Sequence, residues 1–165
     1  MTNTAYLGLG SNVDAERHIR IAIDALRQRF GGVVISPVYR SKAVGFDGED
    51  FLNLAASIET SLGPYDLRSF LRDLEGQHGR DRAAPKWSDR TLDIDILLID
   101  DLVIYDDELE IPRREILKFA HVLVPLADIA PDVTFPGHDR TLAELRDSLS
   151  LDESSLAPAR INFPS

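Results

Sequence analysis

The order in which hydrophobic periodicities follow one another is the feature that most constrains the fold of this chain. Alternation with a period of two is typical of strands, and apolar residues three or four apart are typical of helices. Strands are predicted at 4–10, 33–40, 51–60 and 91–98, with one helix after the first strand and another after the third. This strand, helix, strand, strand, helix, strand order is the split βαβ arrangement, so the sequence predicts an α+β ferredoxin-like core.

Both predicted helices carry an apolar stripe. The stripe comprises Ile19, Ile23, Leu26 and Phe30 in the first helix, and Leu67, Phe70, Leu71 and Leu74 in the second. Asp14 is positioned to cap the start of the first helix, and Gly31-Gly32 to end it. The second helix begins near Pro64, a residue that suits the first helical turn.

Beyond the fourth strand the chain adds helical segments to the same domain. A short helix is predicted near 115–120, and another begins at Thr141, where Thr141 and Glu144 form a capping-box pattern. The tail after Leu151 is rich in Ser, Pro and Ala and is expected to be loosely held. With no internal repeat and no linker, residues 1–165 are expected to form one domain.

The chain is acidic, with a formal net charge of −10 from 28 acidic and 18 basic residues. Such a charge disfavours nucleic acid as a partner. One basic segment stands out, GQHGRDRAAPKWSDR at 76–90, which contains Arg80, Arg82, Lys86 and Arg90. A local positive excess suggests a small anionic ligand such as a polyphosphate, and a solvated loop is the alternative.

The chain contains no cysteine, which excludes disulfides, thiolate metal sites and cysteine nucleophiles. Its first residues, MTNTAYLGLGSN, lack the basic and apolar regions of a signal peptide. No stretch approaches the ~20 apolar residues of a membrane span. We therefore expect a cytoplasmic protein without a membrane partner, and we expect it to be a monomer.

Asp93 and Asp95 are the sharpest candidates for chemistry. In a strand they project from one face, with Cα atoms roughly 6.5–7 Å apart. Neighbouring carboxylates repel unless a cation neutralises them, and oxygen ligands without His or Cys favour Mg²⁺ over Zn²⁺. Arg82 and Arg90 strengthen this interpretation, because a phosphate–Mg²⁺ site uses both charge types. The alternative is a solvent-facing strand edge on which acids are tolerated.

Three further features carry weaker signals. Trp87, the only tryptophan, lies in the basic segment and could cover a flat ligand or simply pack onto its own domain. The segment GLGSN at 8–12 lacks the third glycine of a dinucleotide-binding motif, so a tight strand-to-helix turn is favoured. His121 lies in the apolar run FAHVLVPL, as expected of a buried or pocket-lining imidazole.

Four motifs together resemble one enzyme family. They are YLGLGSN, VYRSKAVGFDGEDFLN, GRDRAAPKWSDRTLDIDILL and IPRREILKFAHVLVPLADIAP, in this order between about Ala5 and Thr134. The chain resembles 6-hydroxymethyl-7,8-dihydropterin pyrophosphokinase, and RTLDIDILL is highly specific to that family. The resemblance implies a ferredoxin-like α+β fold and a Mg²⁺-dependent enzyme of folate synthesis that transfers pyrophosphate from ATP to the pterin.

The resemblance also implies roles for individual residues. Asp93 and Asp95 resemble the pair that holds two Mg²⁺ ions on the ATP phosphates, and Arg82 and Arg90 resemble basic residues of the catalytic centre. The nucleotide side is assigned Glu75, Arg80, Arg82, Arg113 and Arg114. The pterin side is assigned Ser41, Val44, Phe51, Asn53, Trp87 and His121.

The sequence departs from the family pattern near its last motif. Arg113 stands where the family usually has His, His121 where it usually has Phe, and Phe119 where Arg is common. Two positions near the nucleotide, Glu108 and Glu110, are acidic. Imidazole can still stack, and Arg113 can still reach a phosphate.

The implied mechanism is direct attack of the pterin hydroxymethyl oxygen on the β-phosphorus of ATP, with AMP leaving. Such chemistry depends on positioning and charge neutralisation, and no protein general base is assigned. Two other interpretations stay open. One is a non-catalytic or re-purposed pterin-binding relative, and the other is a metal-dependent phosphohydrolase that uses the same aspartates.

Overall fold

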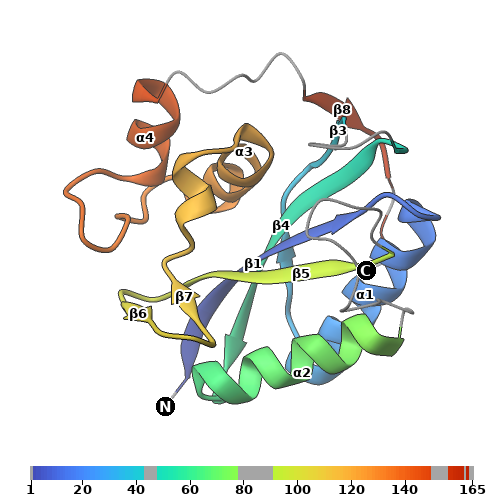
Figure 1. Ribbon diagram of the computed structural model, residues 1–165, viewed down its shortest axis with the longest axis horizontal. Coiled ribbons are helices and arrows are strands. Elements are labelled where there is room, and N and C mark those ends of the chain that lie inside the picture. Colours follow the sequence, from blue (N-terminus) through green and yellow to red (C-terminus); the bar gives the residue numbers. More distant parts are fainter. Residues whose placement is uncertain (1, 43–47, 78–90, 150–155, 162, 164–165) are drawn as a thin grey trace.

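The computed structural model describes residues 2–42, 48–77, 91–149, 156–161 and 163 (Figure 1). The strands are β1 Asn3–Ser11, β2 Val34–Ile35, β3 Val38–Ser41, β4 Phe51–Thr60, β5 Asp93–Ile99, β6 Ile104–Tyr105, β7 Glu110–Ile111 and β8 Ala157–Ala159. The helices are α1 Ala15–Phe30, α2 Pro64–Gln77, the 3₁₀ helix η1 Arg114–Leu117, α3 Ala120–Ile129 and α4 Leu142–Ser148. None of the helices in these ranges has the length and hydrophobicity that crossing a bilayer requires.

The main sheet has the strand order β5-β1-β4-β3-β8, and β2 also pairs with β4. All of these pairs are antiparallel, and β1 lies between β4 and β5. The order β5-β1-β4-β3 is that of a split βαβ sheet, in which each crossover helix connects two parallel strands that are separated by another strand. The predicted ferredoxin-like α+β core is therefore confirmed.

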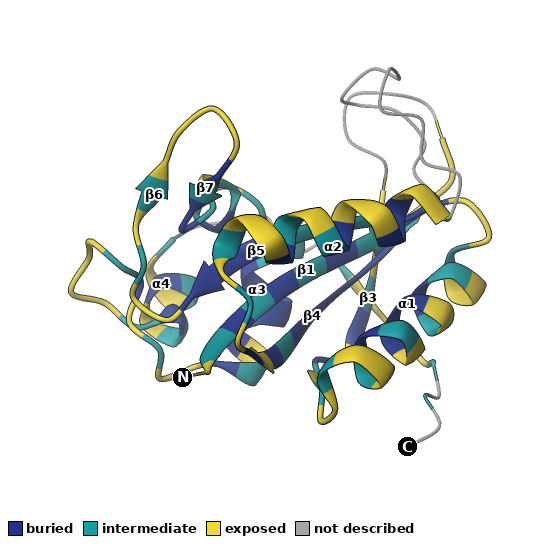
Figure 2. Cartoon of the chain, turned by 90° about the horizontal axis from the view of Figure 1, so that it is seen from below, coloured by how far each residue is buried: buried dark blue, intermediate teal, exposed yellow. Residues whose placement is uncertain are grey.

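The two faces of the sheet are covered by different helices (Figures 1 and 2). Helices α1 and α2 cover one face, where the predicted stripe residues Ile19, Ile23 and Leu26 are completely buried. Helix α3 packs on the other face, against β4 and β1. Each fully buried leucine or isoleucine contributes about 1.5–3 kcal/mol, so these stripes account for much of the stability of the sandwich.

Two local predictions differ from the structure. The single strand predicted at 33–40 is broken into β2 and β3 at Ser36-Pro37, where proline lacks an N–H and the Ser36 hydroxyl accepts the Ala55 N–H instead. Asp14 precedes α1 but does not cap it through its side chain. Its backbone is left-handed, with φ 45°, and its carboxylate pairs with Arg17 at 3.4 Å.

The C-terminal third contains one confirmed helix start and two unpredicted features. Thr141 and Glu144 form the predicted reciprocal capping box at the start of α4. The segment near 115–120 is mainly the 3₁₀ helix η1, and the longer helix α3 follows it, with Pro125 inside. Strand β8 pairs with β3 and extends the sheet, a pairing that local sequence patterns do not predict.

Candidate functional site

Two glycines of β1, Gly8 and Gly10, form a strip without side chains on one face of the sheet. The strip runs between predicted site residues on β4 and those on β5. In the sheet register Gly10 of β1 pairs with Asn53 of β4 on one side and with Asp93 of β5 on the other. Gly8 pairs with Asp95 in the same way. Paired residues project from the same face of a sheet, so Asn53 and the two aspartates flank a floor made by β1.

The glycine at position 10 keeps this floor open. A Cβ there would lie 3.4 Å from the Asn53 Oδ1 and 3.8 Å from the Phe51 ring. The strand therefore leaves a flat surface against which a planar molecule could lie. Both glycines belong to β1, within the strand predicted at 4–10, and the turn begins only after Ser11. Their role as an open floor is not among the sequence predictions. The signal was their spacing of two residues within a strand, which places both on one face.

The residues predicted to bind the pterin lie together on β3 and β4. The Asn53 side-chain N–H donates to the Ser41 hydroxyl at 2.7 Å, and both residues are only 7% exposed. Ser41 pairs with Phe51 in the register between the two strands. This hydrogen bond fixes the orientation of the Asn53 amide, whose carbonyl oxygen points toward the glycine strip.

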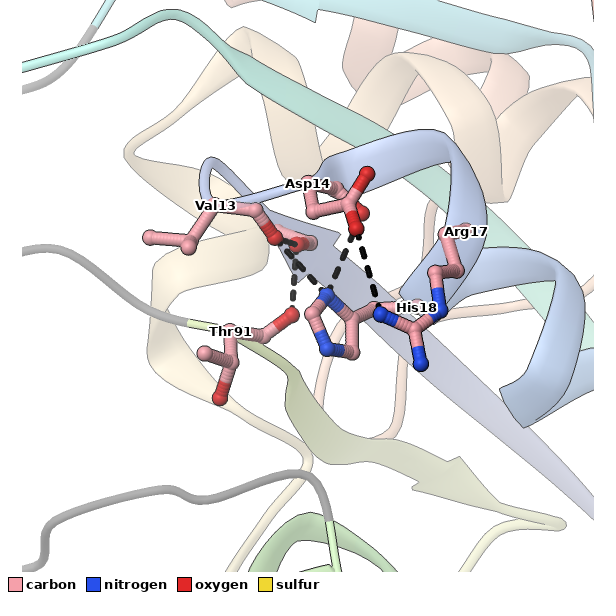
Figure 3. A network of polar contacts seen from close by, with 6 residues as sticks. Val13, Asp14, Arg17, His18 and Thr91 are labelled. Carbon is pink, nitrogen blue, oxygen red and sulfur yellow. Dashed lines mark hydrogen bonds and ion pairs between the residues drawn. The ribbon is translucent and has the colours of Figure 1, made fainter.

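The turn after β1 is tied to the segment that leads into β5 (Figure 3). The Ser11 hydroxyl lies 2.5 Å from the Thr91 carbonyl oxygen and 3.3 Å from that of Val13. The His18 ring contacts the carbonyl oxygens of Val13 and Asp14, at 2.8 and 3.1 Å. The Ser11–Thr91 contact links the end of the glycine strip to the segment before the aspartate strand, and the His18 contacts hold the turn itself.

The aspartates of β5 lie in an environment of strong and unequal charge. Burial and the neighbouring Asp93 raise the pKa of Asp95 from 3.8 to about 8, and the Arg113 guanidinium opposes that rise. Asp95 still keeps 31% of its side-chain surface exposed. Arg113 lies between two carboxylates, with its Nε 3.6 Å from Asp95 Oδ2 and its Nη2 3.6 Å from Glu115 Oε1. Carboxylates this close repel each other unless cations neutralise them, and the Arg113 guanidinium is one such cation.

A pocket of about 220 Å³ opens beside Asp95. It lies between α2, the edge strand β5 and the segment 109–113. Charged residues that line it are Arg68, Arg72, Glu75, Asp95, Glu110 and Arg113, and apolar ones include Leu71, Ile96 and Leu109. The combination of apolar walls and cationic side chains suits a base attached to a polyphosphate.

Glu75 lines this pocket and also braces its wall. Its Oε2 accepts the Ile94 backbone N–H at 2.8 Å, and the residue is 3% exposed. The bond joins α2 to the part of β5 between the two aspartates. Glu75 therefore lines the same pocket as Asp95, and it has a structural contact that the sequence did not reveal.

The remaining described candidates are held by other contacts. The His121 ring stacks on Phe119 at the start of α3, with ring centroids 5.1 Å apart, and burial lowers the pKa of His121. The Arg114 guanidinium lies 4.4 Å above the Tyr105 ring and 3.9 Å from Glu110, on the β6–β7 hairpin. Of the two adjacent arginines, only Arg113 is thus shown beside the aspartates.

Five predicted site residues fall outside the described parts of the chain: Val44, Arg80, Arg82, Trp87 and Arg90. Within the described ranges, no three His, Cys, Asp or Glu residues are grouped as they would be to hold a metal. Asp95 beside the pocket, with Asp93 two residues away on the same strand, still fits Mg²⁺, which keeps several waters and takes further oxygens from substrate phosphates. The chemistry of the donors therefore fits a magnesium site that a substrate completes.

Comparison with known proteins identifies the family. The sequence model of the 7,8-dihydro-6-hydroxymethylpterin-pyrophosphokinase (HPPK) family matches residues 6–131. The chain belongs to this family. Its relatives named 2-amino-4-hydroxy-6-hydroxymethyldihydropteridine pyrophosphokinase include a protein of Bacillus subtilis, 37% identical over 81% of both chains. Another is from Aquifex aeolicus, 39% identical over 90% of this chain and 93% of that protein.

Solved structures of HPPK proteins share the fold. A substituted HPPK-DHPS of Plasmodium falciparum, crystallised with pterin and p-hydroxybenzoate, superposes with a TM-score of 0.74 at 14% identity. It is matched over 96% of this chain but only 47% of its own length. The wild-type Plasmodium protein gives a TM-score of 0.69 at 15% identity, over 89% of this chain and 43% of that one. This chain therefore spans less than half of those longer proteins.

Proposed function

We propose that this HPPK-family chain transfers a pyrophosphoryl group from ATP to 6-hydroxymethyl-7,8-dihydropterin, giving AMP and the pterin pyrophosphate for folate synthesis. The observation that supports this most directly is the register of β1, in which Gly10 lies between Asn53 and Asp93. An acceptor ring beside Asn53 and a triphosphate beside the aspartates would meet across this glycine. Family membership supplies the identities of the two substrates.

The transfer forms one bond and breaks another at the β-phosphorus. The pterin hydroxymethyl oxygen attacks, the bond to the AMP oxygen breaks, and the hydroxyl proton is released to solvent. Phosphoryl-type transfer requires alignment and charge stabilisation more than covalent catalysis. A rigid sheet that holds the two substrates over strands on either side of β1 would supply the alignment, because correct orientation lowers the entropic part of the barrier.

Asp93 and Asp95 are the residues that would hold magnesium. Two Mg²⁺ ions would neutralise charge on the phosphate oxygens. Arg113, at the edge of β5, would contact the same phosphates, and the predicted contributions of Arg80, Arg82 and Arg90 would add to it. Magnesium dependence, the count of two ions and these arginine roles are parts of the proposal.

The pterin side would select its ligand by shape and hydrogen bonding. The Asn53 amide has both donors and acceptors and is oriented by Ser41. Phe51 offers an aromatic surface next to it, and Val44, Trp87 and His121 are proposed to complete the pocket. An aromatic ring packed on a planar ligand contributes about 0.5–1.5 kcal/mol beyond the buried area.

The test is an assay of AMP formation from ATP, with and without the hydroxymethylpterin and with and without Mg²⁺. AMP that appears only when both are present supports the proposal. Phosphate release without the pterin would favour the phosphohydrolase, and pterin binding without AMP would favour a non-catalytic relative. Size-exclusion chromatography with light scattering tests the expected monomer, and fractionation of cells tests the expected cytoplasmic location.

A further inference from the structure

Arg113 is held beside Asp95 by its own backbone. Its N–H donates to the Leu97 carbonyl oxygen at 2.9 Å, which places the residue against the outer edge of β5. Asp95 lies two residues earlier on that strand. The Arg113 side chain is 28% exposed and lines the same pocket as Asp95. A cation has thus been placed next to a carboxylate that is proposed to bind metal.

The contact between these two side chains is an ion pair without hydrogen bonds. The Arg113 guanidinium lies 3.6 Å from the Asp95 carboxylate and 3.6 Å from the Glu115 carboxylate. A charge-assisted hydrogen bond would measure about 2.7–2.9 Å. The Arg113 Nε is enclosed and has no hydrogen-bond acceptor among the described residues. An enclosed donor without an acceptor is destabilising, so the guanidinium would gain by turning to a better acceptor.

A triphosphate in the pocket offers such an acceptor. Guanidinium groups bind phosphate oxygens through two parallel hydrogen bonds, which is a stronger arrangement than the contact with Asp95. Once Arg113 has turned to a phosphate, Asp95 loses its partner while Asp93 and Glu115 remain close by. The carboxylate then needs another cation, and the phosphates at the same place provide further oxygen ligands for a divalent ion.

We propose that Arg113 couples metal binding to nucleotide binding, by competing with divalent metal for Asp95 until a triphosphate draws its guanidinium away. The inference rests on the proposed function for the identity of the nucleotide. It makes Arg113 a positioning residue as well as a phosphate contact. By thermodynamic linkage, metal must then raise the affinity for the triphosphate by the same factor as the triphosphate raises that for metal.

The test measures Mn²⁺ binding to the intact chain by electron paramagnetic resonance, without nucleotide. Replacing arginine by methionine keeps an unbranched stem and removes the competing charge. We expect Arg113→Met to bind Mn²⁺ about tenfold more tightly than the wild type, the change expected when about 1.4 kcal/mol of competition is removed. The matched control is Arg146→Met. Arg146 lies on α4 and pairs with Asp128 of α3 at 3.5 Å.

A second measurement isolates the coupling. The affinity for a non-hydrolysable ATP analogue is measured with and without Mn²⁺. The factor by which Mn²⁺ raises this affinity should be smaller in Arg113→Met than in the wild type and in Arg146→Met. Thermal melts establish that each variant is folded, and Arg113→Gln replaces Arg113→Met if the latter unfolds.

Equal Mn²⁺ affinity in the wild type and both Arg113 variants would overturn the proposal. An equal increase in Arg146→Met would also overturn it, because the effect would then come from net charge alone. Failure of the wild type to form AMP would refute the proposed function instead, and the Mn²⁺ comparison would still decide whether Arg113 competes with metal.

Discussion

The β3–β4 side of the site and its β5 side are held together by different forces. Asn53 and Ser41 are neutral, almost fully buried and joined by a 2.7 Å hydrogen bond. Asp95 and Arg113 are ionisable, 31% and 28% exposed, and 3.6 Å apart. Only the strip of β1 that contains Gly8 and Gly10 separates the two sides.

This difference indicates how the two sides would work. The neutral side is oriented by a hydrogen bond before any ligand arrives, so it can bind at little cost of reorganisation. The charged side contains carboxylates that lack enough cations, so its favourable state depends on what it binds. A ligand therefore changes the β5 side more than the β3–β4 side, and the following variants test this contrast.

The largest effect is expected for Asp93→Asn and Asp95→Asn. Each keeps the shape of the side chain but removes a charge that holds Mg²⁺, so kcat should fall about 10²–10³-fold, or roughly 2.7–4 kcal/mol. The protein should stay folded, because a repelling pair becomes a single carboxylate. Turnover measured against Mg²⁺ concentration, with a metal-free thermal melt, checks this. Near-normal activity of both variants at limiting Mg²⁺ would rule out the two-aspartate mechanism.

A smaller and more selective effect is expected for Asn53→Ala. Loss of hydrogen bonds to a buried polar group costs about 1–3 kcal/mol, so pterin affinity should fall while affinity for an ATP analogue stays nearly unchanged. Calorimetry with each ligand separately makes the comparison, and Ser41→Ala tests whether orienting the amide matters. Equal pterin affinity in Asn53→Ala and the wild type would remove Asn53 from the site.

The metal-free protein should lose stability as pH rises toward 8. The pKa of Asp95 is raised in the folded state to about 8, from 3.8, so the folded chain binds more protons than the unfolded chain between these values. The resulting stabilisation is complete below about pH 4 and is lost as pH rises through the folded pKa. Each unit of pKa difference between the folded and unfolded states is worth about 1.4 kcal/mol. We expect the free energy of unfolding to fall by at least that much.

The measurement is the melting temperature between pH 5 and 8.5 in a chelating buffer, for the wild type and Asp95→Asn. The wild type should lose about 3 °C or more over this range, and Asp95→Asn should lose less. Identical slopes would show that another group is responsible. Saturating Mg²⁺ with an ATP analogue should flatten the wild-type slope, because a bound cation favours the ionised carboxylate.

The smallest effect is expected for Gly10→Ala, which tests the strip between the two sides. The added Cβ would meet the Asn53 Oδ1 at 3.4 Å, an ordinary contact, so folding should change little. A ring that lies over the strip would be lifted, and pterin affinity should fall less than tenfold, or below about 1.4 kcal/mol. Unchanged affinity in both Gly10→Ala and Gly10→Val would show that the ligand does not lie over β1.

Local periodicity determined much of the fold from the sequence. The order of strands and helices, the stripes of α1 and α2 and the capping box at Thr141 all depend on residues a few positions apart. The shared face of Asp93 and Asp95 follows from the period of two in a strand. The family motifs also allowed Ser41, Phe51 and Asn53 to be assigned to one ligand before their proximity was known.

Contacts between distant segments were decided only by the tertiary structure. The position of Gly10 between Asn53 and Asp93 depends on the register of three strands, which no local pattern specifies. The approach of Arg113 to Asp95 depends on a backbone bond to Leu97, and the pairing of β8 with β3 joins residues more than 110 positions apart. Periodicity reports which face a residue occupies, whereas the partner across that face is selected by the packing of the whole chain.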